Sequence, residues 1–305
     1  MALQTDNKVI IANHKVLVTL PEEVDSIKCS AQAGMTIVTD DIYCISTQSS
    51  GTGKKPVALH KLLNYLPENT GSSKAVILHT ASGSKNIAMH ANSLTYHDHL
   101  FYLATMNTDE NASQVMAFDS EGKICSKYTY SNSATDRIGT VNYYDTTEEG
   151  ALCFLVSVGR GQDVRFRLVK INKTGLENVG NPFVVSVPDL AYTKGNDHYY
   201  DRTTKQLYVI KFETPTTEGS DIKNNLILQY DLSGGIPQTN TPKKPVRTLK
   251  VSAAKGEEKF EIEGISIYRY TDGNKTKEIK YVCANIVKLK NGKRVQADAV
   301  CQLYI

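Results

Sequence analysis

A short pattern that recurs five times is the feature that most constrains how this chain can fold. Each copy places an apolar anchor after a small or acidic residue, and a small or polar residue and a second apolar or aromatic residue follow it. The anchors are Met35, Leu94, Val141, Leu190 and Ile265, which lie 59, 47, 49 and 75 residues apart. A period of about 40 to 50 residues is typical of β-propeller blades, and loop insertions account for the longer intervals.

An alternating apolar segment follows every anchor, and the alternation predicts a β-strand. These second strands are DIYCIST, HLFYLATM, ALCFLVSV, KQLYVIKF and EIKYVCANI. A third strand follows each of them, and in four repeats a fourth strand comes after it, in several cases beyond a glycine-containing turn. The fifth repeat ends at its third strand with Ile305.

The missing fourth strand of the last repeat is supplied, we expect, by the N-terminus. Residues 9–20 have strand character and no other place in the repeat. Pairing them with the C-terminal strand would remove an open sheet edge. The sequence therefore predicts an all-β fold: a single five-bladed β-propeller over residues 1–305, with the N-terminal strand closing the last blade. A β-sandwich or two small β domains is the alternative, although no Pro/Gly/Ser-rich linker divides the chain.

Charge and composition narrow the classes of partner. The 35 basic and 32 acidic residues give a net charge of +3 and form no basic block, so nucleic acid is not an expected partner. No apolar run approaches the ~20 residues of a membrane helix, and the N-terminus lacks a secretory signal pattern. We expect a monomer.

The six cysteines show no metal-binding spacing, and neither a metal nor a cofactor is expected. Cys44, Cys153 and Cys283 lie in apolar second strands, where a cysteine acts as a small buried hydrophobe. We expect free thiols that resist modification in the native protein. One disulfide between neighbouring strands is the alternative.

Ligands of propellers usually meet the residues at the mouth of the central channel, where the first strands begin. The residues around the anchors are mostly small and polar, which also suits close packing of the strands. No catalytic motif is present among them. The predicted ligand-binding residues are Thr36, Asn92, Thr95, Asn142, Asp189, Glu263 and Ser266.

The blade pattern resembles that of known propellers over nearly the whole chain. The repeated order is GMT or SLT, a turn, IYCI or LFYLAT, and then a strand ending in D-x-x-G. This order resembles the blades of tachylectin-type lectins, and it also resembles secreted bacteriocin-like proteins related to helveticin J. The lectin resemblance implies a glycan ligand bound by Tyr in place of Trp, since the chain has 17 Tyr and no Trp. The helveticin resemblance implies an extracellular protein, its signal removed, that acts on bacterial surfaces.

The preferred functional hypothesis is a non-catalytic recognition module that binds a glycan or another cell-surface ligand at the channel mouth. One alternative is a glycosidase that uses Asp189 and Glu263, because a carboxylate pair is the minimum for glycoside hydrolysis. The first repeat has Ala33 and Gly34 where five-bladed glycosidases carry an Asp, which weakens that alternative. The second alternative is a protein-interaction scaffold. His97 and His198 are placed in solvent-facing turns, as a second location for a binding site.

Overall fold

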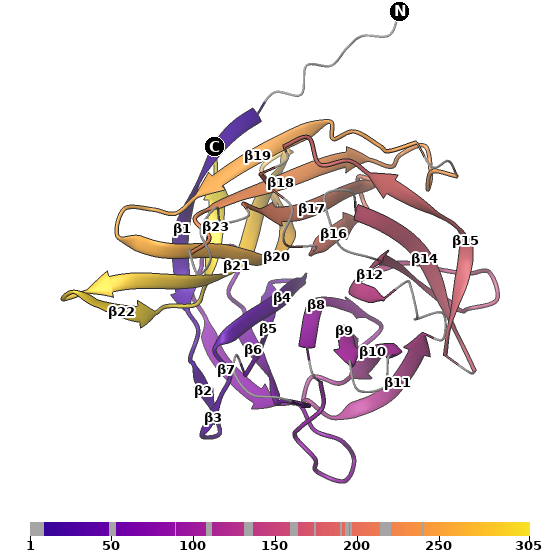
Figure 1. Ribbon diagram of the computed structural model, residues 1–305, viewed down its shortest axis with the longest axis horizontal. Helices are drawn as coiled ribbons and strands as arrows, with labels where there is room; N and C mark the ends of the chain where they lie inside the picture. Colours follow the sequence, from indigo (N-terminus) through magenta and orange to yellow (C-terminus); the bar gives the residue numbers. More distant parts are fainter. Residues whose placement is uncertain are drawn as a thin grey trace, which may run out of the picture.

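The computed structural model describes residues 9–48, 53–88, 90–107, 112–130, 137–158, 164–173, 175–189, 191–192, 195, 197–213, 221–238 and 241–305. Every regular element in these ranges is a β-strand. The pairings form units of four antiparallel strands, which radiate from a common centre (Figure 1). The predicted all-β propeller fold is confirmed.

The first two units follow one another along the chain. The first contains β4 (Ala31–Val38), β5 (Asp41–Thr47), β6 (Val57–Leu63) and β7 (Ser72–Ile77). The second contains β8 (His90–His97), β9 (Leu100–Asn107), β10 (Ala112–Phe118) and β11 (Ile124–Tyr130). A small hairpin of β2 (Glu23–Val24) and β3 (Ile27–Lys28) precedes them.

The next two units repeat this order. The third contains β12 (Ile138–Thr146), β13 (Leu152–Val158), β14 (Val164–Asn172) and β15 (Gly175–Val185). The fourth contains β16 (His198–Asp201), β17 (Gln206–Phe212), β18 (Asn224–Asp231) and β19 (Arg247–Ser252). All of the predicted second strands are confirmed by β5, β9, β13, β17 and β21.

The fifth unit is completed by the N-terminal strand. It contains β20 (Glu257–Asp272), β21 (Lys275–Lys290), β23 (Ala299–Tyr304) and β1 (Val9–Thr19), and β22 (Lys293–Gln296) extends β21 as a hairpin. β1 pairs with β23 antiparallel over residues 13–19 and with β19 parallel over residues 9–12, so the C-terminus lies beside β1 (Figure 1). The predicted closing role of residues 9–20 is confirmed.

The first strands of the units run in the same direction around the centre. Ser93 Oγ accepts a hydrogen bond from the Val141 backbone and Thr95 Oγ1 accepts one from the Tyr143 backbone, so β8 and β12 run in the same direction. Thr140 and Asn142 of β12 bond in the same way to His198 and Tyr200 of β16. The beginnings of these inner strands therefore gather at one end of the axis, which we call the entrance end. Their last residues gather at the opposite end, which we call the exit end.

Five hydrophobic clusters fill the spaces between adjacent units, including one between the fifth and the first. Small residues let the inner strands approach closely. A Cβ added to Gly264 of β20 would lie 2.8 Å from the backbone nitrogen of Met35, and one added to Gly34 would lie 2.5 Å from the Cα of Ser93. Glycine at these two positions therefore allows β4 to pack directly against both neighbours.

The fourth inner strand lies further along the chain than the sequence pattern suggested. The strand is β16, whereas Leu190, the predicted anchor, lies outside the described residues, and Asp189 precedes β16 in a loop. The spacing between paired first and second strands does not mark it either. Met35 pairs with Cys44 and Leu94 with Leu103, nine residues apart, but Val141 pairs with Val156, fifteen residues apart, so counting back from the second strand does not locate β16.

Candidate functional site

Two of the predicted ligand-binding residues hold neighbouring units together. Thr95 Oγ1 accepts a hydrogen bond of 3.1 Å from the backbone of Tyr143, and Asn142 Oδ1 accepts one of 3.2 Å from the backbone of Tyr200. Both side chains are buried. Their polar atoms thus satisfy backbone N–H groups that the separate sheets leave unpaired. A ligand-binding role for them stays a prediction.

The other predicted residues are distributed along the axis. Thr36 and Ser266 are buried on β4 and β20, and Ser266 is a hydrogen-bond partner of the Tyr199 hydroxyl. Asn92 is half-buried at the beginning of β8. Asp189 is exposed, and its Oδ1 caps the turn by accepting a bond of 3.0 Å from the Ala191 backbone. Glu263 alone among the seven is a carboxylate on an inner strand, beside Gly264 in β20.

Glu263 has a strongly perturbed environment. Burial and the negative charges of Glu261 and Asp197 raise the pKa of Glu263 well above its usual value, against the opposing charge of Lys259. Asn285 Nδ2 donates a hydrogen bond of 3.0 Å to Glu263 Oε1, and Asn285 Oδ1 accepts one of 2.7 Å from the Gln32 backbone. The side chain of Glu263 is therefore fixed through β21 to the first unit.

Asp197 is the functional candidate that the sequence pattern did not identify. It directly precedes β16, and its carbonyl accepts a bond of 2.8 Å from Ile210. Burial raises the pKa of the Asp197 carboxyl well above its usual value, and its Oδ1 is buried without a hydrogen-bond partner. The charge of Asp197 contributes to the raised pKa of Glu263, and Asp197 directly precedes β16 at the entrance end.

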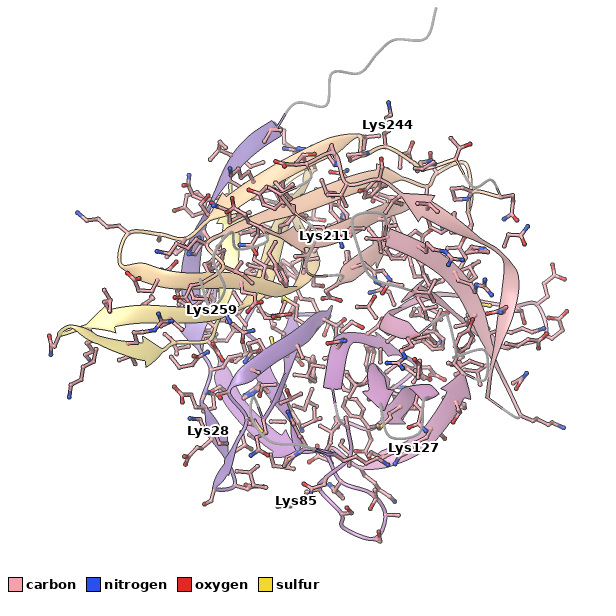
Figure 2. All side chains as sticks on the ribbon, in the orientation of Figure 1. Lys28, Lys85, Lys127, Lys211, Lys244 and Lys259 are labelled. Carbon is pink, nitrogen blue, oxygen red and sulfur yellow. The ribbon has the colours of Figure 1, made fainter. Side chains whose placement is uncertain are left out.

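Two lysines near the entrance end, Lys259 and Lys211, have different surroundings. Lys259 Nζ lies 2.5 Å from Glu261 Oε2. Lys211, on β17, is fully buried, and burial lowers its pKa to about 8. Figure 2 shows Lys211 toward the centre of the disc, whereas Lys28, Lys85, Lys127 and Lys244 lie toward its rim. The entrance end thus combines desolvated carboxyl groups with a desolvated amine.

The prediction that His198 lies in a solvent-facing turn is wrong. His198 is buried on β16, where its Nδ1 lies 2.6 Å from Thr140 Oγ1 and its Nε2 lies 3.1 Å from the carbonyl of Leu155. Burial lowers the pKa of His198 to about 3, so the ring is neutral and joins the third and fourth units. His97 stacks on Tyr143 with ring centroids 3.8 Å apart, at the exit end.

No group of three or more His, Cys, Asp or Glu side chains in the described part of the chain could hold a metal ion. No helix in those residues is long and apolar enough to cross a membrane.

Comparison with known proteins identifies similar structures. No protein-family model matches the sequence, and no curated protein matches it. The Bacteroides ovatus xyloglucan PUL GH43B is 14% identical with a TM-score of 0.50; the match covers 95% of this chain but 53% of that chain, so this chain spans about half its length. The catalytic domain of the Coprinopsis cinerea GH62 α-L-arabinofuranosidase is 8% identical with a TM-score of 0.53, and the match covers 96% and 95% of the two chains.

These similarities support the propeller fold and correct the functional preference drawn from the sequence. The preferred non-catalytic recognition module is contradicted, because the similar folds belong to glycoside hydrolases. The glycosidase alternative is better supported. The resemblance to tachylectin-type lectins and helveticin J-related proteins is supported only at the level of the propeller architecture.

Proposed function

We propose that the protein is a glycoside hydrolase whose active site lies at the entrance end of the axis. The observation that carries the proposal is the pair of desolvated carboxyl groups of Glu263 and Asp197, contributed by adjacent units. The fold that the chain shares with a GH62 α-L-arabinofuranosidase is consistent with a glycan substrate.

The chemistry follows from the protonation of the pair. Glycoside hydrolysis needs one carboxyl group that donates a proton to the leaving oxygen and a second that acts as base or nucleophile. Burial raises the pKa of both groups, and the charge of Asp197 raises that of Glu263 further, which favours the protonated form that an acid needs. We assign the acid role to Glu263, because Asn285 holds its Oε1 and leaves the other oxygen to carry the proton.

Asp197 supplies the second carboxylate in this proposal. It replaces Asp189, the second carboxylate in the alternative drawn from the sequence. Asp189 is exposed, and its Oδ1 accepts a hydrogen bond from the Ala191 backbone within its own turn. The unpartnered Oδ1 of Asp197 suits a group that binds water or a sugar hydroxyl, because a buried acceptor without a partner is costly. Asn92, the half-buried polar side chain at the beginning of β8, is proposed as a contact for substrate hydroxyl groups.

The test is hydrolysis of a panel of p-nitrophenyl glycosides that includes α-L-arabinofuranoside. Glu263→Gln should lower kcat/KM by about 10² to 10⁴-fold, the usual contribution of general acid catalysis. The wild-type rate should fall as pH rises through the raised pKa of the acid. Glu177→Gln, an exposed glutamate on the outer strand β15, is the matched control and should retain full activity. Absence of turnover by the wild-type protein, or full activity of Glu263→Gln, would refute the proposal.

A further inference from the structure

The seam between the first and the last units contains two cysteines. Cys44 lies on β5 and Cys283 on β21, and both are free, fully buried and in one hydrophobic cluster. The chain closes into a ring at this seam, where β1 completes the fifth unit. A covalent bond here would therefore join the two ends of the array.

The backbone places the two thiols opposite each other. Met35 pairs with Cys44 in the first unit, and Gly264 pairs with Cys283 in the fifth. A Cβ on Gly264 would lie 2.8 Å from the backbone nitrogen of Met35 and 3.0 Å from Cys283 Sγ, so the sulfur lies within the contact between the two sheets. The Cys44 side chain also contributes to the raised pKa of the Cys283 thiol, as a neighbour in the same cluster would.

A pocket lies one strand away from Cys44. It has a volume of about 100 Å³ and lies between the end of β1 and strands β6 and β7, with His60 among its lining residues. His60 is the register partner of Cys44. A small molecule in the pocket would thus be one strand position from Cys44, whereas a bulky reagent would not pass the fully buried strands.

We propose that Cys44 and Cys283 are an oxidation site that forms a disulfide across the ring-closing seam. With hydrogen peroxide as the two-electron oxidant, the Cys44 sulfur attacks one peroxide oxygen and forms a sulfenic acid with release of water. The Cys283 sulfur then displaces the hydroxyl group, which leaves as a second water when the thiol proton is transferred to it. Two S–H bonds and one O–O bond are broken, and one S–S bond and two O–H bonds are formed.

The local environment sets the rate of this reaction. Burial, together with the Cys44 side chain, raises the pKa of the Cys283 thiol well above its usual value, which makes the thiolate scarce and the reaction slow. Large alkylating reagents should leave both residues unmodified in the native protein. Slow oxidation by a small oxidant without alkylation is therefore the expected signature of the site.

The experiment is oxidation of the native full-length protein with hydrogen peroxide, followed by alkylation in denaturant, digestion without reduction and mass spectrometry. We expect one cross-linked peptide pair that contains Cys44 and Cys283 and is lighter by two hydrogens than its parts. The melting temperature should rise by roughly 5 °C, from the constraint on the unfolded chain, and return on reduction. Recovery of both residues as alkylated thiols, while exposed Cys125 becomes oxidised, would overturn the proposal.

Two variants make the outcome specific. Cys44→Ala should lose the cross-link and the reversible rise in melting temperature. Cys153→Ala, which removes a buried cysteine from β13 of the third unit, should retain both. If Cys44→Ala fails to fold, loss of the rise in Cys283→Ala serves the same purpose. A rise that persists in both seam variants would show that the stabilisation comes from other residues and would refute the assignment.

Discussion

The strand β16 has an aspartate at each end, and the two carboxyl groups have opposite surroundings. Asp201, its last residue, receives hydrogen bonds from both guanidinium nitrogens of Arg269 and from Thr203 and Thr204. Asp197, which precedes the first residue, leaves Oδ1 buried without a partner, and burial raises its pKa well above the usual value. The two groups lie only one short strand apart.

The difference separates a structural charge from a functional one. At the exit end, Arg269 also bonds to Glu278, so three charged groups compensate one another between the fourth and fifth units. At the entrance end, burial raises the pKa of both Asp197 and Glu263, and the charge of Asp197 raises that of Glu263 further. Uncompensated carboxyl groups persist where chemistry requires a shifted pKa, and this contrast supports placing the active site at the entrance end.

Loss of the exit-end cation should have the largest effect on stability. Arg269→Ala removes the cation from the buried Asp201 and leaves the partly buried Glu278 with Lys280 alone, and removing one member of a buried pair typically costs about 3–5 kcal/mol. Because the Arg269 side chain is 21% exposed, we expect a loss of about 3 kcal/mol in urea unfolding. Arg294→Ala is the control: Arg294 makes two bonds to Asp221 but is 55% exposed, and its loss should have little effect on stability.

The bond that fastens β1 to β20 should have the next largest effect. His14 Nε2 lies 3.0 Å from Glu257 Oε2, and the His14 ring stacks on Phe260 with centroids 4.0 Å apart. His14→Ala removes both contacts, and we expect a loss of about 2 kcal/mol. His99→Ala, in an exposed turn, should leave stability unchanged.

This loss should depend on pH with a definite sign. Burial alone would raise the pKa of Glu257, but bonds from His14 and the Ala254 backbone and the charges of His14 and Lys288 lower it overall. A carboxyl group with a lowered pKa stabilises the fold above its unfolded pKa, and that contribution disappears as pH falls through the folded pKa. The difference between wild type and His14→Ala should therefore narrow in acid. A constant difference from pH 7 to pH 3 would contradict this account.

At the entrance end, removing a charge should have the opposite effect. Asp197→Asn replaces a desolvated carboxyl group by a neutral amide, and we expect a gain of about 1 kcal/mol at pH 8. Because the pKa of Asp197 is raised, the folded wild-type protein holds an extra proton above the unfolded pKa, and its stability falls as pH rises through that window. The gain in Asp197→Asn should therefore disappear in acid, while the glycosidase activity proposed above should be lost at all pH values. Destabilisation at pH 8 would show that Asp197 has a structural partner.

Much of the fold follows from local sequence, because alternation and turn residues mark strands wherever they pack. The N-terminal strand was predicted from a count of repeats, and β1 confirms it. The fourth inner strand was not found because His198, Tyr199 and Tyr200 replace the small residues of the other copies. The bulky side chains of His198 and Tyr200 are accommodated by neighbouring units, which the sequence of one repeat does not reveal.

The candidate site was predicted only in part for the same reason. Glu263 could be identified from its place beside an anchor, since position along the strand fixes its place on the axis. Asp197 differs from any turn aspartate only through its burial, which β17 and the fifth unit create. Thr95 and Asn142 were predicted at the correct positions, but whether such side chains bind a ligand or a neighbouring backbone depends on the spacing between units.

The smallest effect should come from an ion pair that lies outside the ring. Lys277 and Asp272 form a close pair across the β20–β21 hairpin, and their side chains are 51% and 57% exposed. Water screens such a pair, and the lysine loses side-chain entropy on forming it, so Lys277→Ala should leave stability unchanged within the error of the measurement. Urea unfolding in low and in 0.5 M salt provides the measurement, with Arg269→Ala measured beside it. A loss as large as that of Arg269→Ala would mean that pairing itself, and not burial, distinguishes the charged groups of the exit end, and the contrast between Asp201 and Asp197 would then need another explanation.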